Sequence, residues 1–156
     1  MDKLSIIQWN CQSISGKTGE LIKYLDKQKR YPDILLLQET YLKSTNTFKL
    51  KGYNIERLDR SHLKAAGGIT TCIKEGIPYL RHQDQLGIES MRISISIKGG
   101  ILQVINVYLS PSIKFSSDEL SPLFSFDNCI VGGDFNAYAN TFGADRSSNL
   151  GIGAKD

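Results

Sequence analysis

Hydrophobic residues follow two different patterns over the first forty positions. Residues 4–9 form a short, mostly apolar and partly β-branched run, which predicts a strand. Over residues 18–30 apolar positions recur at helical spacing between charges, and this pattern ends before Tyr31-Pro32, which helices seldom cross. Residues 33–38 are a nearly continuous apolar run, typical of a strand buried on both faces. The beginning of the chain therefore predicts strand, helix, strand.

Beyond Glu39 the pattern changes to short strand-like runs separated by glycine turn signals. These runs cover residues 53–58, 68–74, 91–97, 101–109 and 129–131. Strict alternation over residues 91–97 gives one buried face, and Lys98-Gly99-Gly100 is a tight connection, so this run and the next predict a hairpin. Ser116 and Glu119 have capping-box spacing, which predicts a short helix that Pro122 stops within two turns.

Length and composition fit a single globular domain. The chain has 156 residues, of which 40% are hydrophobic and 22% charged, which is enough apolar surface for one core. The three cysteines at positions 11, 72 and 129 have neither disulfide nor zinc-site spacing, so we expect buried free thiols in a reducing compartment. No apolar stretch is long enough for a signal peptide or a membrane span, and we expect an intracellular protein that uses no membrane.

The charge distribution is uneven although the net charge is only +3. Residues 41–74 contain seven basic and two acidic side chains, an excess larger than that of the whole chain. Such a region suits a polyanion such as nucleic acid, but a solvated loop region explains it equally well.

Polar residues follow four of the predicted strands directly. Asn10, Glu39 and Tyr108 each end an apolar run, and Asp134 and Asn136 follow the last one. Polar residues at the ends of buried strands meet at one edge of a layered α/β protein, so we expect one composite site. Two carboxylates and two carboxamides make an oxygen-rich set that suits Mg²⁺, and phosphate chemistry is the natural use of such a cation.

Each of these residues also has a structural explanation. Asn10 could be a turn residue and Tyr108 could pack at the rim of the sheet. Asp134 and Asn136 could form an Asx turn after Gly132-Gly133. Glu39 is harder to explain in this way, because a carboxylate at the end of an interior strand needs a partner. We assign structural or solvent-exposed positions to Trp9, His62 and His82.

Four motifs in order resemble those of the endonuclease/exonuclease/phosphatase family. They are Gln8-Trp9-Asn10, Gln38-Glu39-Thr40, Asn106-Val107-Tyr108-Leu109 and Gly133-Asp134-Phe135-Asn136-Ala137. Within that family the chain is similar to the apurinic-endonuclease-like domain of non-LTR retrotransposons, over about residues 4–151. The resemblance implies an α/β fold, specifically part of a four-layer α/β/β/α sandwich.

The resemblance also implies roles for the site residues. Glu39 would be the principal ligand of Mg²⁺ or Mn²⁺, with Asn10 assisting the metal or the phosphate. Tyr108 would contact the scissile phosphate, Asp134 would position the attacking water, and Asn136 would bind the phosphate. The substrate would be double-stranded DNA, nicked in the nucleus, and in a full-length relative a reverse transcriptase domain would lie on the same polyprotein.

One departure from the family pattern concerns the general base. The family carries it as a histidine in a Ser-Asp-His motif late in the domain, whereas His62 and His82 both precede Tyr108. We therefore expect residues 1–156 to be a single domain that is truncated at its C-terminal end. Three functions stay open: a metal-dependent DNA endonuclease, an inactive remnant that only binds nucleic acid, and a phosphatase or phosphodiesterase with another substrate.

Overall fold

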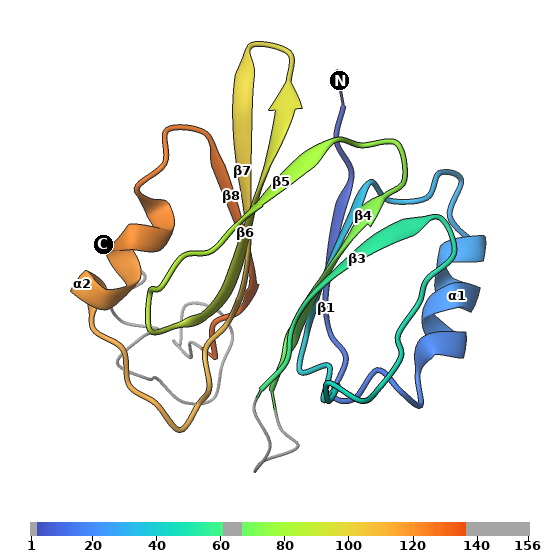
Figure 1. Cartoon of the computed structure of the whole chain (residues 1–156), viewed down its shortest axis with the longest axis horizontal. Helices are drawn as coiled ribbons and strands as arrows, with labels where there is room; N and C mark the ends of the chain where they lie inside the picture. The colour runs from blue at the N-terminus through green and yellow to red at the C-terminus, as the bar shows by residue number, and fades with distance from the viewer. Residues whose placement is uncertain (1–2, 61–66, 137–156) are drawn as a thin grey trace, which may run out of the picture.

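Two four-stranded sheets face each other in the computed structural model, which describes residues 3–60 and 67–136 (Figure 1). The first sheet has the order β1-β2-β4-β3 and is built from β1 (Ile6–Asn10), β2 (Ile34–Gln38), β3 (Tyr53–Leu58) and β4 (Ile69–Lys74). The second has the order β5-β6-β7-β8 and is built from β5 (Tyr79–His82), β6 (Glu89–Ile97), β7 (Gly100–Tyr108) and β8 (Cys129–Asp134).

Helices cover the outer faces of both sheets. The helix α1 (Thr18–Asp26) lies on the first sheet, and α2 (Ser117–Leu120) with the 3₁₀ helix η1 (Ser121–Phe124) lies on the second (Figure 1). Leu21 and Leu25 of α1 pack with Leu35 and Leu37, while Leu123 of η1 packs on the other sheet. The described residues therefore form the four layers α/β/β/α, and the predicted fold class is confirmed.

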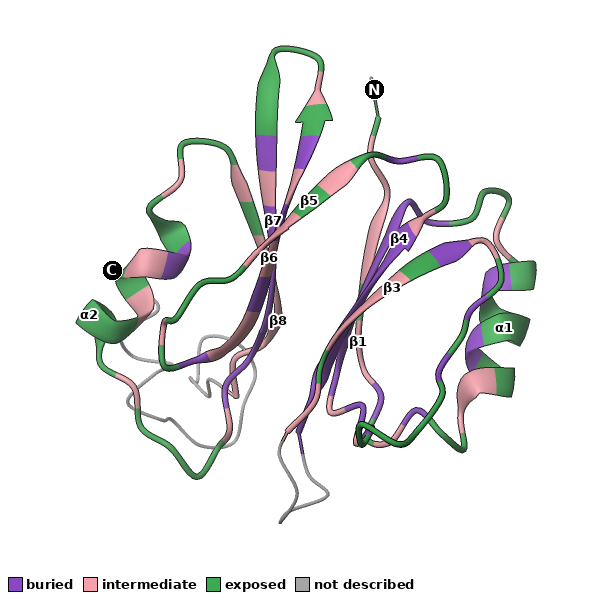
Figure 2. Cartoon of the chain, viewed as in Figure 1, coloured by how far each residue is buried: buried purple, intermediate pink, exposed green. Residues whose placement is uncertain are grey.

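The apolar layer between the sheets explains why β2 is apolar at almost every position. Leu36 points between the sheets, where Ile93 and Val104 of the second sheet meet it, and Leu35 and Leu37 point outward to α1. All five residues of β2 are buried, and the inner strands of both sheets are the most buried parts of the molecule (Figure 2). Burial of this kind stabilises the fold by about 25 cal/mol per Å² of apolar surface.

The initial strand, helix and strand form as predicted, with β1 and β2 parallel. The helix ends at Asp26 rather than at Arg30, so its predicted length was wrong. The N–H groups of Lys27 and Gln28 bond three residues back, to Tyr24 and Leu25, which tightens the last turn. Beyond Leu25 the sequence offers no apolar side chain to continue the buried face.

The middle of the chain matches the predicted strands with two differences. The hairpin of β6 and β7 forms, but β6 begins at Glu89, two residues before the predicted start. The short strand β5 was not predicted, because four residues without alternation carry little signal. The capping box of Ser116 and Glu119 is present, and Pro122 lies near the start of η1, where its missing N–H costs nothing.

The cysteines agree only in part with the expectation of buried thiols. Cys11 and Cys72 are buried, whereas Cys129 is half-buried at the start of β8. Among the described helices none is long and apolar enough to cross a membrane.

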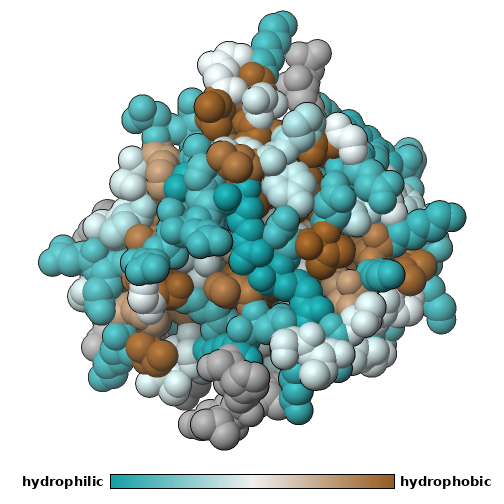
Figure 3. All heavy atoms as spheres, viewed as in Figure 1, coloured by the Kyte–Doolittle hydropathy of each residue, from teal (hydrophilic) through white to brown (hydrophobic). Residues whose placement is uncertain are grey.

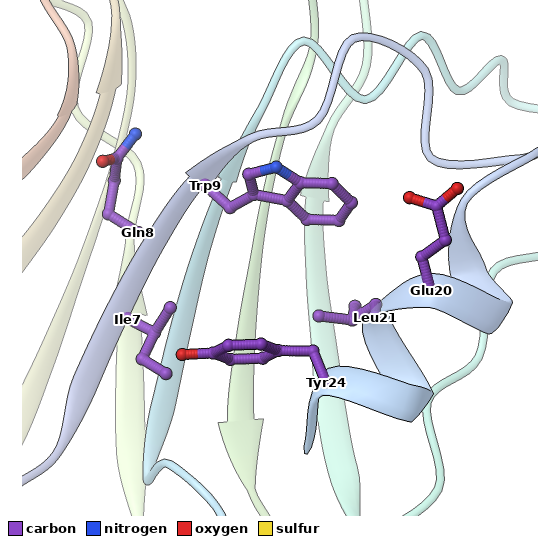
Figure 4. A pocket seen from close by; sticks show the side chains of 6 residues that line it. All are labelled: Ile7, Gln8, Trp9, Glu20, Leu21 and Tyr24. Atoms are coloured by element: carbon purple, nitrogen blue, oxygen red, sulfur yellow. The ribbon is translucent and has the colours of Figure 1, made fainter. Parts of the chain in front are cut away.

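A hollow of about 340 Å³ separates the edge strand β1 from α1. Ile7, Trp9, Leu21 and Tyr24 line it with apolar surface, whereas Gln8 points to the other side of the strand (Figure 4). Trp9 also packs against the core beneath α1, which agrees with its structural assignment. This hollow holds one carboxylate, that of Glu20, and none of the polar residues that end the strands lines it.

Candidate functional site

The carboxyl ends of β1, β2, β7 and β8 lie at one edge of the two sheets, the lower edge in Figure 1. There the side-chain amide of Asn10 donates to two carboxylates at once, to Glu39 Oε1 at 2.8 Å and to Asp134 Oδ2 at 2.6 Å. One nitrogen atom thus holds side chains from both sheets together. The convergence expected from the strand ends is present, and it brings residues 10, 39 and 134 into one cluster.

The Glu39 carboxylate is held on both of its oxygens. Asn10 binds Oε1, and the hydroxyl of Tyr41 donates to Oε2 at 2.5 Å. Burial raises the pKa of Glu39, but hydrogen bonds from Tyr41, Asn10 and Tyr108 outweigh it and lower that pKa. Glu39 is therefore ionised at neutral pH even though it is half-buried.

Tyr108 ends β7 with its side chain almost wholly buried beside Ile69 and Met91. Burial, together with the negative charge of Glu39, raises the pKa of Tyr108. Its phenol consequently keeps its proton at neutral pH and can donate a hydrogen bond to an anion. The rim-packing explanation is correct for the ring, and the hydroxyl still faces the carboxylate cluster.

Asp134 and Asn136 form the Asx turn that was the structural alternative. The backbone N–H of Asn136 donates to Asp134 Oδ1 at 2.9 Å, and the Asn136 amide donates to the carbonyl of Leu109 at 2.7 Å. The turn fixes one Asp134 oxygen while Asn10 holds the other. The structural and the functional explanation of Asp134 are compatible, because the Asx turn orients the Asp134 carboxylate.

A buried polar network beneath the site joins the two sheets. Gln38 Nε2 donates to Asn106 Oδ1 at 2.7 Å, and Asn106 Nδ2 donates to the carbonyl of Thr70 at 3.0 Å. Gln8 reaches Gln38 Oε1 at 2.6 Å from the edge strand. Since both Gln38 and Asn106 are fully buried, these bonds fix how the end of β2 sits over β7.

Three residues of the site have backbones in the left-handed region. The φ angles are 50° for Glu39, 54° for Tyr41 and 46° for Asn136. Such angles are uncommon for residues other than glycine, and a bulky aromatic residue there is a clear outlier. Strained backbone of this kind concentrates at functional sites, where the surrounding structure holds it.

Sequence reasoning missed two residues of this cluster. Tyr41 binds Glu39 directly, and its position two residues after Glu39 was the only signal for it. Arg60 lies with its guanidinium carbon 5.7 Å from the centroid of the Tyr108 ring. It counted only as one of seven basic residues, because nothing in the sequence distinguishes it from the others.

Part of the positive charge in the basic region of residues 41–74 is paired in the structure. Arg57 pairs with Asp59 at 2.6 Å and Arg60 with Glu89 at 2.7 Å. Lys43, Lys49 and Lys51 are exposed. His62 lies outside the described residues, and His82 on β5 bonds Ser94 Oγ at 2.9 Å, which agrees with a structural role.

The donor set of the site fits a hard divalent cation. Glu39 and Asp134 offer neighbouring carboxylate oxygens, and the closest thiol, that of Cys11, stays neutral because burial raises its pKa to about 11. In the described part of the chain, no three His, Cys, Asp or Glu side chains gather into a complete metal cage. A cation that keeps water and substrate oxygens among its ligands, as Mg²⁺ does, suits such a site.

Together the two facing sheets and the carboxylate cluster at their shared edge indicate the class of hydrolytic nucleases and phosphatases. Comparison with known proteins agrees with this class. The family model described as "Endonuclease/Exonuclease/phosphatase family" matches residues 7–152. The chain therefore belongs to the endonuclease/exonuclease/phosphatase family.

The curated relatives are retrotransposon polymerases from Drosophila melanogaster. The probable RNA-directed DNA polymerase from transposon BS is 31% identical over 146 residues, which are 88% of this chain and 16% of that protein. The corresponding protein from transposon X-element is 30% identical over 160 residues, 97% of this chain and 17% of that protein. The chain thus spans about a sixth of the length of these relatives.

Solved structures show the same fold. The endonuclease domain of TRAS1, a telomere-specific non-LTR retrotransposon, superposes with a TM-score of 0.74 at 17% identity, over 98% of this chain and 68% of that one. An AP endonuclease from Leishmania major gives a TM-score of 0.64 at 17% identity, over 86% of this chain and 55% of that one. The chain is a domain of the nuclease and phosphatase family that is similar to retrotransposon proteins.

Proposed function

We propose that this chain is a divalent-metal-dependent endonuclease domain that nicks double-stranded DNA for a retrotransposon. The observation that carries the proposal is the amide of Asn10 held between the carboxylates of Glu39 and Asp134. The similar transposon proteins are RNA-directed DNA polymerases, which supports a reverse transcriptase on the same polyprotein. Action in the nucleus follows from a chromosomal DNA substrate.

Glu39 is the proposed principal ligand of Mg²⁺ or Mn²⁺, with Asn10 beside it. A bound divalent cation would polarise the scissile phosphate and stabilise charge on the leaving oxygen. Glu39 is ready for a cation because it is ionised and both of its oxygens are oriented. Asn10 keeps the two carboxylates at one place until the substrate arrives.

Tyr108 and Asp134 have complementary proposed roles. The protonated phenol of Tyr108 donates to a non-bridging oxygen of the scissile phosphate and neutralises part of its charge. Asp134 positions the attacking water, since Asn136 and Asn10 hold its two oxygens in a fixed direction. Asn136 is the proposed second contact to the phosphate, at the cost of its bond to Leu109.

A second candidate is a domain that binds nucleic acid without cleaving it. Within residues 3–60 and 67–136 no histidine lies at the site, because His82, the one histidine of these ranges, lies on β5 and bonds Ser94 of β6. A phosphatase or phosphodiesterase with another substrate would use the same carboxylates, and no feature of the described residues favours it over DNA.

A plasmid-nicking assay tests the proposal. Wild-type protein with Mg²⁺ should convert supercoiled plasmid to the open circle, and EDTA should stop the reaction. Glu39→Ala and Asp134→Ala should each lower the rate by at least about 10²-fold. Glu75→Ala removes an exposed carboxylate outside the cluster and should nick at the wild-type rate.

Two other results would change the assignment. Salt-dependent binding of duplex DNA with no nicking above the level of Glu39→Ala would favour the binding-only candidate. Hydrolysis of a small phosphomonoester with Mg²⁺, with plasmid left intact, would favour the phosphatase candidate.

A further inference from the structure

Arg60 joins the two sheets next to the proposed phosphate-binding phenol. It follows β3 at the same edge as the site, and its Nε donates to Glu89 Oε2 at 2.7 Å. Glu89 begins β6 directly opposite Tyr108 in the strand register. The Arg60 guanidinium therefore lies beside the Tyr108 ring, with its carbon 5.7 Å from the ring centroid.

The local backbone accommodates this guanidinium. Gly67 has a φ of 94°, and a Cβ at that position would lie 2.6 Å from Arg60 Cζ. The N–H of Gly68 binds the other oxygen of Glu89. Any larger residue at position 67 would displace the Arg60 side chain, so Gly67 leaves the space that Arg60 occupies.

The Arg60 side chain is more exposed to solvent than Glu89, which anchors it. The Arg60 side chain is 34% exposed and that of Glu89 is 12% exposed. Arg60 binds Glu89 through its Nε. The two Nη nitrogens of Arg60 are the donors that a phosphate would engage.

We propose that Arg60 binds a backbone phosphate of the DNA substrate next to the phosphate that Tyr108 contacts. The inference rests on the proposed function and adds a residue that sets where the backbone lies on the site. A cation is needed there because Glu39 and Asp134 repel a polyanion, and Arg60 is the positive group that stacks on Tyr108. Arginine suits this task, because its planar donors match phosphate oxygens.

The alternative is that Arg60 and Glu89 only tie the sheets together. Two charge-removing variants separate these roles, since Arg60→Gln and Glu89→Gln both break the same ion pair. If the pair is only a tie, both variants weaken DNA binding equally or not at all. If Arg60 binds phosphate, Arg60→Gln loses affinity, whereas Glu89→Gln binds at least as tightly as wild type because it removes a competing negative charge.

The measurement is the binding of a fluorescent duplex oligonucleotide in EDTA at several salt concentrations. Arg60→Gln should weaken binding by about tenfold, and the slope of log K against log salt should become shallower by about 0.9, one phosphate contact. Arg60→Lys should restore the slope. Arg81→Gln is the matched control, because Arg81 is also 34% exposed and also paired across the sheets, to Glu56 at 2.8 Å. Figure 3 shows hydrophilic side chains along the middle of the visible face of the molecule.

Each outcome has a definite meaning, provided that all variants melt cooperatively. Equal behaviour of Arg60→Gln and Glu89→Gln, or a salt slope unchanged by Arg60→Gln, overturns the inference. Absence of duplex binding by the wild-type protein overturns it as well. Because binding is measured without divalent metal, the inference can hold when nicking fails, and it can fail when nicking succeeds.

Discussion

Asn10 and Asp134 are hydrogen-bonded at 2.6 Å although 124 positions separate them in the chain. Asn10 ends the edge strand of the first sheet, and Asp134 ends the edge strand of the second. This bond therefore closes the site across the two sheets. The same amide also binds Glu39, so the relative position of both carboxylates depends on one side chain.

Asn10→Asp should destabilise the metal-free protein. The change replaces a donor shared by two carboxylates with a third carboxylate, so two hydrogen bonds become repulsions. We expect a loss of about 1–3 kcal/mol in the free energy of unfolding, measured by urea denaturation in EDTA. Adding Mg²⁺ should reduce the difference, because a cation favours the extra charge.

Asn54→Asp is the control for this change, since Asn54 is exposed on β3 and its substitution adds the same charge elsewhere. Equal stability of Asn10→Asp and wild type in EDTA would show that the amide does not bridge the carboxylates in solution.

Tyr41→Phe should alter the acid dependence of stability in the metal-free protein. Folding lowers the pKa of Glu39, so its contribution is present above its ordinary pKa and is lost as pH falls through the lowered value. Removing the Tyr41 hydroxyl removes one of the hydrogen bonds that lower this pKa. The stability advantage of wild type over Tyr41→Phe should therefore shrink as pH falls from about 6 to about 3.

Urea titrations at several pH values in EDTA measure this difference. Tyr24→Phe, at an exposed tyrosine of α1, should show a constant difference over the same range. A wild-type advantage over Tyr41→Phe that grows on acidification would contradict the lowered pKa of Glu39.

The sequence predicted the strands and the convergence of their ends for a simple reason. Strands buried on both faces give continuous apolar runs, and residues such as Glu39 stand out against them because a charge there needs a partner. Layering then places the ends of parallel strands at one edge. Neither step requires knowledge of the loops.

The missed features depend on contacts between segments that are distant in the chain. Arg60 becomes distinct only because Glu89 and Tyr108, in register on the second sheet, lie against it. Tyr41 reaches Glu39 only because its φ is 54°, and no local pattern predicts that angle. β5 has no pattern of its own and exists because β6 offers it an edge.

Asn106→Ala should be among the costly single changes in the core. Asn106 is fully buried and binds Gln38 on one side and the carbonyl of Thr70 on the other. Its loss leaves buried polar groups without partners. We therefore expect the free energy of unfolding, measured in urea, to fall by about 2–4 kcal/mol.

Gln103→Ala on the outer face of the same strand should cost less than about 1.5 kcal/mol, because its partner Arg92 is also bound to Asp84. The two substitutions thus compare a buried amide that joins the sheets with a half-buried one that does not. Similar losses for both would show that the network beneath the site adds no specific stability.

Gly133→Ala should disrupt the pairing of β7 with β8. A Cβ at position 133 would overlap the carbonyl of Val107 and lie 2.9 Å from its backbone nitrogen. Backbone cannot shift as easily as a side chain, so we expect a loss above about 3 kcal/mol in the free energy of unfolding and a clearly lower melting temperature.

Gly132→Ala should cost less, because its Cβ would meet the side-chain end of Leu36 at 2.6 Å, and a side chain shifts more readily than backbone. Gly16→Ala meets nothing within 4 Å and should melt within a few degrees of wild type. If Gly133→Ala melts like Gly16→Ala, the strands do not approach as closely as the register requires, and Asp134 would not be held at the site by this pairing.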